Sequence, residues 1–269
     1  MAVVTGGANG IGRACCERFA EEGAHVVVAD LLDAAGAETV AILEGLGAKA
    51  SFVHLDAASP ADSLAVMQAA IDTFGALDVL VTAAGISHAG YRSGDRDGNL
   101  QMLARAAETL QDPPRALLDL TLEEWQKVLD VNLTGTLLAL QAAARHMVRL
   151  GRGGSIITIA SIAAKVPEAG PAPYAVSKAG VWMLTKHTAR SLGPAGIRVN
   201  AIGPGFIETN MTEIINEMPL IRDQFLATVP LRRMGRAREV ADAAVFLACD
   251  ESSYVTGEIL HPDGGFYTD

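Results

Sequence analysis

The sequence predicts a single α/β domain of the doubly wound type, in which helices cover both faces of a parallel sheet. Strand-like and helix-like patterns alternate from one end of the 269-residue chain to the other. Several strand-like runs are apolar throughout, as in parallel strands that are buried on both faces. No linker rich in Pro, Gly or Ser and no internal repeat divides the chain, so residues 1–269 are treated as one domain.

The expected elements follow this alternation in order. The strands are short apolar runs rich in β-branched residues, near 2–5, 25–30, 50–54, 77–83, 155–160, 197–202 and 258–261. The helices are longer stretches with apolar residues at helical spacing, near 11–22, 33–46, 60–74, 121–150, 173–192 and 236–248. The helix over 121–150 opens on Thr121-Leu-Glu-Glu124, a capping box with Thr121 as its N-cap.

Two segments interrupt the alternation. Residues 86–118 are polar and glycine-rich, and then carry helical apolar spacing from Asn99 to Leu110 before Asp112-Pro-Pro114. Residues 203–235 run from Gly203-Pro-Gly205 through an amphipathic stretch. Because loops this long in a compact domain are usually functional, we expect an insertion at the rim of the substrate site or at a subunit contact, and a lid on the substrate side. The alternative for the insertion is a tolerated surface loop, since long insertions cost little loop entropy.

Composition excludes several classes of function. Half of the residues are hydrophobic and only 19% are charged, which excludes a disordered chain. The net charge of −10 and the lack of any basic run argue against a nucleic-acid partner. No apolar run approaches the length of a membrane span. With three cysteines that cannot all pair and no visible signal peptide, we expect a cytoplasmic protein.

A glycine-rich turn opens the chain. The β-branched run from Ala2 leads to Gly6, Gly10 and Gly12, after which a helical pattern begins. Such glycines let the backbone approach a pyrophosphate, which then lies at the positive end of the helix. The spacing differs from GxGxxG, and a turn of this kind can be a turn alone. Asp30 ends the next strand, where a dinucleotide site places a carboxylate on the adenosine ribose; the alternative is a helix N-cap.

A second pattern carries reaction chemistry. Tyr174 and Lys178 lie four residues apart on a predicted helix, so both side chains share one face. A nearby ammonium group favours the phenolate, and we therefore expect Lys178 to lower the pKa of Tyr174. Ser161 ends an apolar strand thirteen residues before Tyr174 and adds a neutral hydroxyl. The alternative is that Tyr174 and Lys178 are an ordinary surface pair. The glycine-rich turn at the start of the chain makes this interpretation the weaker one.

These motifs occur together in the order of one known family. With Thr5-Gly-(x)3-Gly-x-Gly12, Asn132, Ser161, Tyr174-(x)3-Lys178 and Pro204-Gly205, the chain resembles the short-chain dehydrogenases/reductases over essentially its whole length. The resemblance implies a seven-stranded parallel sheet of the Rossmann type, NAD(P)-dependent oxidoreduction and a homotetramer.

The resemblance also implies individual roles. Tyr174 would be the general acid/base, Ser161 would hold the substrate oxygen, and Lys178 would hold the nicotinamide ribose. Asn132 would help to hold a water in a proton relay. Asp56 would meet the adenine, and Ile207 and Thr209 the carboxamide end. The cofactor-binding residues expected in all are Gly6, Asn9, Gly10, Ile11, Gly12, Asp30, Leu31, Asp56, Ala57, Ala83, Ala84, Gly85, Tyr174, Lys178, Pro204, Gly205, Ile207 and Thr209.

The chain departs from the family pattern in two places. The family often has Asn-Asn-Ala-Gly after the fourth strand, whereas this chain has Thr82-Ala-Ala-Gly85, so side-chain hydrogen bonding there must come from other groups. The stretch from Gly85 to Asn132 is also roughly twenty residues longer than in typical relatives, which locates the insertion.

The reading that follows is an NAD-dependent oxidoreductase that interconverts a secondary alcohol and a ketone. NAD is expected because Asp30 would repel a 2′-phosphate and neither Leu31 nor Asn9 offers a cation for it. The alternatives are an NADPH-dependent ketoacyl-type reductase and a non-catalytic NAD-binding protein. The histidines show no metal-ligand spacing. An apolar substrate pocket is expected around Ala163, Ala164, Phe206, Met211 and Met218.

Overall fold

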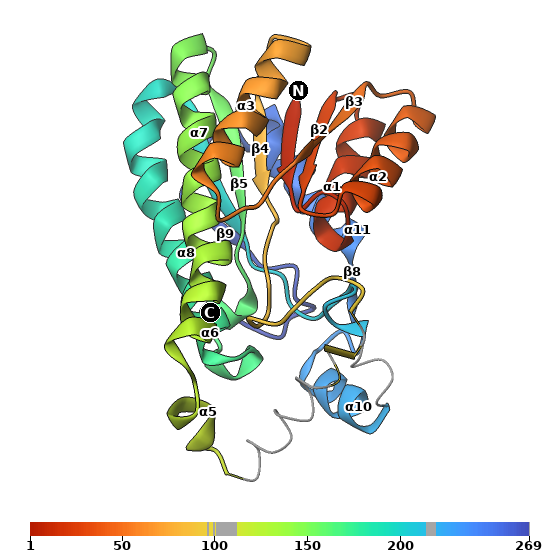
Figure 1. Cartoon of the computed structure of the whole chain (residues 1–269), viewed down its shortest axis with the longest axis vertical. Coiled ribbons are helices and arrows are strands. Elements are labelled where there is room, and N and C mark those ends of the chain that lie inside the picture. The colour runs from red at the N-terminus through yellow and green to blue at the C-terminus, as the bar shows by residue number, and fades with distance from the viewer. Residues whose placement is uncertain (96, 99, 101–111, 214–218, 269) are drawn as a thin grey trace.

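Seven parallel strands form the centre of the molecule (Figure 1). A computed structural model describes residues 1–95, 97–98, 100, 112–213 and 219–268. The strand order is β3-β2-β1-β4-β5-β6-β9, which confirms the predicted fold class. The strands are β1 (Ala2–Thr5), β2 (Val26–Asp30), β3 (Ala50–His54), β4 (Val79–Thr82), β5 (Gly154–Ile159), β6 (Ile197–Ile202) and β9 (Ile259–Leu260).

The strand order reverses between β1 and β4, and this reversal positions the site. From β1 the chain adds β2 and β3 on one side, and from β4 it adds β5 and β6 on the other. Connections therefore leave β1 and β4 in opposite directions, and a crevice opens beyond their carboxyl ends. Thr5 pairs with Thr82 at that end of the two strands.

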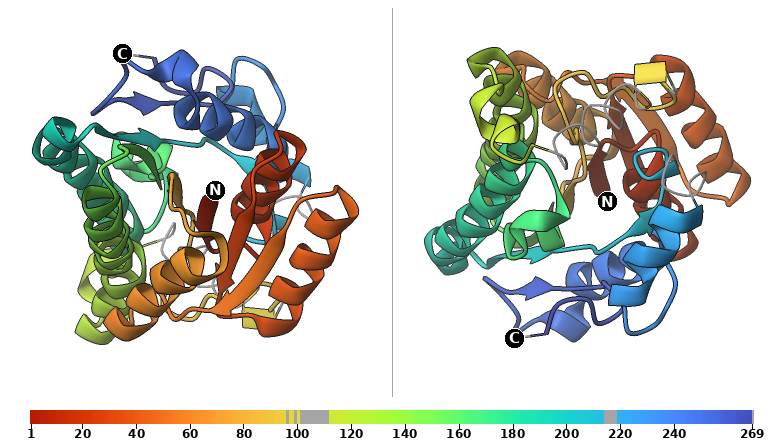
Figure 2. Two further views of the ribbon diagram at one scale, coloured as in Figure 1. Left: turned by 90° about the horizontal axis from the view of Figure 1, so that it is seen from above. Right: turned by 90° about the horizontal axis from the view of Figure 1, so that it is seen from below.

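Helices cover both faces of the sheet (Figure 2). One core packs α1 (Gly10–Glu21) and α11 (Ala237–Ala248) against the sheet, and α2 (Asp33–Gly45) lies beside α1. The other core packs α3 (Pro60–Phe74) and α7 (Gly135–Leu150), beside α8 (Ala172–Leu192). Within β1, Val4 belongs to the first core and Val3 to the second. Successive strand residues point to opposite faces, so a continuously apolar strand is buried on both.

The helix predicted over 121–150 is confirmed as an unbroken run of helical residues over 122–150, but it contains a π-helical turn that was not predicted. The structure has α6 (Leu122–Leu129), a π-helical turn (Asp130–Thr134) and then α7. The capping box at Thr121 is confirmed. The side chain of Asn132 accepts from and donates to the backbone of Ile86, and these contacts accompany the widened turn. Apolar periodicity carries no sign of such a turn.

The remaining elements surround the crevice. A short parallel pair, β7 (Ile207–Glu208) and β8 (Gly235–Arg236), and α10 (Pro219–Thr228) lie within the predicted lid, and α5 (Arg115–Leu118) lies within the insertion. Short 3₁₀ turns span Ile162–Ala164, Pro167–Ala169, Gly193–Ala195 and Asp250–Ser252. Most of the helix expected from Asn99 to Leu110 lies outside the described residues.

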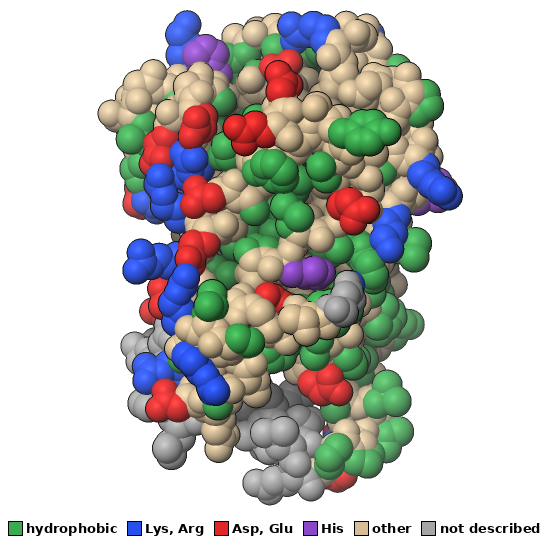
Figure 3. Space-filling model, turned by 180° about the vertical axis from the view of Figure 1, so that it is seen from behind, with side chains coloured by type: hydrophobic (Ala, Val, Ile, Leu, Met, Phe, Trp, Pro, Cys, Tyr) green, Lys and Arg blue, Asp and Glu red, His purple; other side chains and the backbone are tan. Residues whose placement is uncertain are grey.

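No helix among the described residues is both long and apolar enough to cross a membrane. Figure 3 shows acidic and basic side chains interspersed on one face, without a continuous basic patch on that face.

Candidate active site

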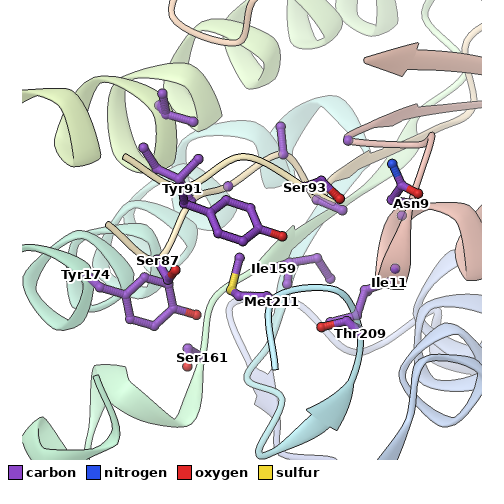
Figure 4. Close-up of a pocket in the computed structure, with 18 of the residues that line it drawn as sticks. Asn9, Ile11, Ser87, Tyr91, Ser93, Ile159, Ser161, Tyr174, Thr209 and Met211 are labelled. Carbon is purple, nitrogen blue, oxygen red and sulfur yellow. The ribbon is translucent and has the colours of Figure 1, made fainter. Parts of the chain in front are cut away.

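A cavity of about 520 Å³ lies at the carboxyl ends of the central strands, a size typical of small-molecule sites. Ser161, Tyr174, Lys178 and every other residue expected to bind the cofactor line it, whereas Asn132 lies behind its wall. Figure 4 shows residues of the glycine turn on one side and Tyr174 with Ser161 on the other. The cavity thus joins the two motifs that are far apart in the sequence.

The glycine turn has the shape that a phosphate group requires. Gly6 has a φ of +68°, and a methyl group there would lie 2.6 Å from the backbone nitrogen of Ala84. A methyl group on Gly12 would lie 2.0 Å from the carbonyl oxygen of Gly6. Asn9, the N-cap of α1, makes no side-chain capping hydrogen bond. The amino end of α1 therefore remains available to an anion, and the residues present fit a dinucleotide pyrophosphate.

Asp30 is held at the end of β2 by two backbone groups. Its Oδ2 accepts a hydrogen bond from Ala8 N and its Oδ1 from Leu32 N, both at 3.0 Å. The N-cap of α2 is Leu32, so Asp30 is not the helix cap that was the alternative. The carboxylate lines the cavity with a fixed orientation, and it fits the role of an acceptor for ribose hydroxyls.

The three catalytic candidates come from β5 and α8. Ser161 follows the end of β5, and its Oγ accepts from Ala163 N at 3.1 Å. Tyr174 and Lys178 lie one turn apart in α8. Lys178 Nζ donates to Ile159 O at 2.9 Å and lies 5.7 Å from the centre of the Tyr174 ring. The backbone of β5 thereby fixes the lysine, and the helix fixes the tyrosine relative to it.

Burial dominates the titration of both groups. Removal from water raises the pKa of Tyr174, while its hydrogen bond with Ser161 acts in the opposite direction. Burial lowers the pKa of Lys178 from 10.5 to about 8. The direction for Tyr174 is opposite to the one expected from a neighbouring cation, because desolvation disfavours the charged form of each group. Tyr174 therefore holds its proton at neutral pH, as a general acid must.

Asn132 supports the site from behind. Its Nδ2 donates to Ile86 O at 2.9 Å and to Ser177 Oγ at 3.0 Å, and its Oδ1 accepts from Ile86 N at 2.8 Å. A methyl group on Gly85 would lie 3.3 Å from Asn132 Oδ1 and 3.4 Å from Lys178 Nζ. The asparagine thus fixes the chain where it leaves β4, directly beside the lysine.

The segment Thr82-Ala-Ala-Gly85, which differs from the family pattern, contains one buried hydroxyl without a hydrogen-bond partner among the described residues. Thr82 Oγ1 is buried and has no hydrogen-bond partner among the described residues. The nearby backbone nitrogen of Ala84 donates to Thr5 Oγ1 at 3.4 Å. Backbone and threonine groups therefore stand where the family pattern has asparagine side chains.

Sequence reasoning missed several residues of the cavity wall. Ser87, Tyr91 and Ser93 line it from the insertion, and Asn210 from the predicted lid. The glycine-rich stretch has no periodicity, so nothing in the sequence separated them from an ordinary loop. Two residues of the expected apolar pocket, Phe206 and Met211, line the cavity. Ala163 and Ala164 are not among the lining residues, and Met218 lies outside the described residues.

Among the described residues no group of three His, Cys, Asp or Glu side chains could hold a metal ion.

Known proteins resemble the chain over nearly its whole length. The family model for short chain dehydrogenases matches residues 1–220. The chain is 36% identical to a 3-oxoacyl-[acyl-carrier-protein] reductase of Chlamydia pneumoniae, covering 98% of this chain and 95% of that protein. It is 38% identical to a (3R)-3-hydroxyacyl-CoA dehydrogenase of Rattus norvegicus, covering 99% of this chain and 96% of that protein.

Solved structures agree with these relatives. A putative gluconate dehydrogenase from Agrobacterium tumefaciens superposes with a TM-score of 0.84 at 31% identity, over 99% of this chain and 95% of that one. A short-chain type dehydrogenase/reductase from Mycobacterium marinum gives a TM-score of 0.84 at 33% identity, over 100% of this chain and 95% of that one. The chain belongs to the short-chain dehydrogenase/reductase family and is an oxidoreductase of that family.

Proposed function

We propose that the protein is an NAD-dependent oxidoreductase that interconverts a secondary alcohol and a ketone, with Tyr174 as general acid/base. One observation carries the proposal. Ser161, Tyr174 and Lys178 line the same cavity as a glycine turn and a strand-end carboxylate. Asp30 and the glycine turn would hold a dinucleotide so that its nicotinamide end could reach the catalytic residues within that cavity.

Each residue then has a distinct task. The bound nicotinamide ring supplies or accepts the hydride. Ser161 donates a hydrogen bond to the substrate oxygen and stabilises charge that develops there. Tyr174 gives its proton to that oxygen in the reductive direction and takes it back in oxidation. Lys178, held by Ile159 O, binds the ribose and returns a proton to Tyr174.

Other residues hold the cofactor or connect the site to solvent. Asn132, next to Gly85 and Lys178, is proposed to help hold the water that relays protons to the lysine. Asp56 is proposed to meet the adenine, and Ile207 and Thr209 the carboxamide end of the nicotinamide. The lid over 203–235 is proposed to cover the substrate side, which is supported by the lining residues Phe206 and Met211.

The preference for NAD rests on Asp30. Its carboxylate would repel a 2′-phosphate about 4 Å away by a few kcal/mol at an effective dielectric constant of about 20. An NADPH-dependent ketoacyl-type reductase is the second candidate. The names of the acyl-carrier-protein and acyl-CoA relatives favour it, as does Arg92, an exposed guanidinium that lines the cavity.

A non-catalytic protein explains the site less well. Lys178 is only 5% exposed, and burial disfavours its charged form. A protein that merely bound the dinucleotide could use Lys178 for the ribose, but it would have no need of the Ser161 and Tyr174 hydroxyls in the same cavity. The cost of keeping the lysine is understandable where it takes part in proton transfer.

The test compares the two cofactors on matched substrates. Initial rates are measured with NADH and NADPH on simple ketones and on 3-oxoacyl thioesters, and in the oxidative direction on the corresponding alcohols. A higher kcat/KM with NADH supports the proposal, and Asp30→Ala should narrow the difference. A higher kcat/KM with NADPH that is lost in Arg92→Ala would establish the second candidate. Solution mass measured in the same preparations tests the expected homotetramer.

A further inference from the structure

Two loops approach each other across the cavity (Figure 4). The first, here called the strap, comprises residues 87–95 after β4 and belongs to the insertion. The second, here called the arm, comprises residues 207–212 and begins with β7. Tyr91 and Ser93 of the strap and Thr209 and Met211 of the arm all line the cavity. The residue numbers show that these loops are remote in the sequence and meet only in the folded protein.

The arm is a self-supporting turn that touches the glycine turn. Thr212 Oγ1 donates to Ile207 O at 2.5 Å and accepts from Thr209 N at 3.1 Å. A methyl group on Gly10 would lie 3.4 Å from Thr209 Cγ2. The arm therefore stands directly beside the place expected for the pyrophosphate, and its own hydrogen bonds fix its shape.

The strap is fixed at one end and bridged to the arm near the other. At its start, Ile86 is bound through both backbone polar groups to Asn132. Tyr91 N then donates to His88 O at 3.0 Å in a turn, and the ring of Tyr91 projects into the cavity (Figure 4). Asn210 Nδ2 donates to Ser93 Oγ at 3.0 Å, across 117 residues of sequence. Among the hydrogen bonds described, this one joins strap to arm.

We propose that the Asn210–Ser93 hydrogen bond is a latch that retains the bound dinucleotide, so that Ser93 and Asn210 set the rate of cofactor release. The proposal rests on the dinucleotide binding expected of the family, and not on the choice between NADH and NADPH. Because residues of both the strap and the arm line the cavity beside the glycine turn, a dinucleotide bound there would be covered by the two loops, and its release would require them to separate. Opening the cover breaks the bond between them, and a weaker bond makes opening more frequent.

The experiment measures release without any turnover. The protein is first loaded with NADH, or with NADPH if that binds more tightly. It is then mixed with an excess of the non-fluorescent oxidised cofactor, and the loss of the fluorescence of the bound reduced cofactor gives the dissociation rate. A hydrogen bond between neutral groups has a modest net strength, so Ser93→Ala and Asn210→Ala should each raise the rate about threefold to tenfold. Ser93→Ala also removes the hydrogen bond of Ser93 with Tyr91, whereas Asn210→Ala removes only the bond to Ser93. The double variant should therefore match Ser93→Ala, since the Asn210–Ser93 bond is already absent there.

Controls separate the latch from a general loss of structure. Ser93→Thr keeps the hydroxyl and should keep a nearly normal release rate. Ser191→Ala removes an exposed hydroxyl that bonds only within α8, and it should leave release unchanged. Unchanged release in both alanine variants, or effects that multiply in the double variant, would overturn the latch. Lack of binding by either cofactor would overturn it together with the dinucleotide site, whereas binding without turnover would count only against the proposed reaction.

Discussion

The two sides of the cavity are built differently. The catalytic wall, formed by Ser161, Tyr174 and Lys178, lies on the end of β5 and on α8, and Ser161 and Lys178 are only 7% and 5% exposed. The cover, formed by the strap and the arm, consists of loops apart from the two-residue β7, and its cavity-lining residues Tyr91, Ser93 and Asn210 are half-buried. In the wall, Lys178 and Ser161 are fixed by hydrogen bonds between their side chains and backbone groups, whereas a bond between two side chains links the two parts of the cover.

This difference matches two physical requirements. Proton and hydride transfer need donor and acceptor held at a fixed separation, which regular elements provide. Exchange of a large cofactor needs a part of the protein that opens at low free-energy cost, which loops with few buried contacts provide. Changes in the wall should therefore alter chemistry or stability, and changes in the cover should alter release.

The largest effect is expected for Tyr174→Phe. The change keeps the ring and removes the hydroxyl that transfers the proton, so kcat should fall at least about a hundredfold. Cofactor affinity should stay within about twofold, measured by NADH fluorescence titration. Tyr254→Phe, at a fully exposed tyrosine, is the matched control. Retention of more than a few per cent of kcat would break the assignment of chemistry to the wall.

A smaller effect, on stability, is expected for Lys178→Met. At pH 7 the lysine is protonated both folded and unfolded, so the wild type bears the whole cost of a buried charge. Since burial lowers the folded pKa from 10.5 to about 8, that cost declines as the pH rises between these values. The variant should gain about 1–3 kcal/mol below pH 8, and the gain should vanish towards pH 10.5.

The comparison is made by denaturant unfolding across this pH range. The lower limit of the expected gain allows for Ile159 O, which loses its donor when the lysine is removed. Lys49→Met, at an exposed position, should show no such dependence. A gain that is independent of pH would mean that the charge of Lys178 is not what burial opposes. Lys178→Met should also lose turnover and cofactor affinity, because the residue is assigned two tasks.

The smallest effect is expected for Thr121→Ala. The change removes the capping box of α6, which leads into the π-helical turn at Asn132, and should cost about 1 kcal/mol of unfolding free energy. Cofactor release should not change, because α6 belongs to neither side of the comparison. Thr73→Ala, an exposed threonine in α3, serves as the reference. A faster release in Thr121→Ala would show that the cover is sensitive to general stability.

Much of the wall could be predicted because its signals are local. A strand followed by glycines and a helix defines a phosphate turn within about a dozen residues. Tyr174 and Lys178 share a helix face by their spacing alone. The role of Asp30 could be predicted because this residue ends an apolar strand. The seven-stranded parallel sheet was also accessible, since the family resemblance implies it, whereas the order of the strands in the sheet came from the structure.

The sequence by itself therefore determined the fold class, the glycine turn and the grouping of Ser161, Tyr174 and Lys178. The tertiary structure decided the π-helical turn at Asn132, the raised pKa of Tyr174 and the bond between Ser93 and Asn210. Each of these depends on groups that are distant in the chain or on exclusion of water by the assembled core. Local patterns carry no information about either, because burial and long-range contact arise only when the elements pack together.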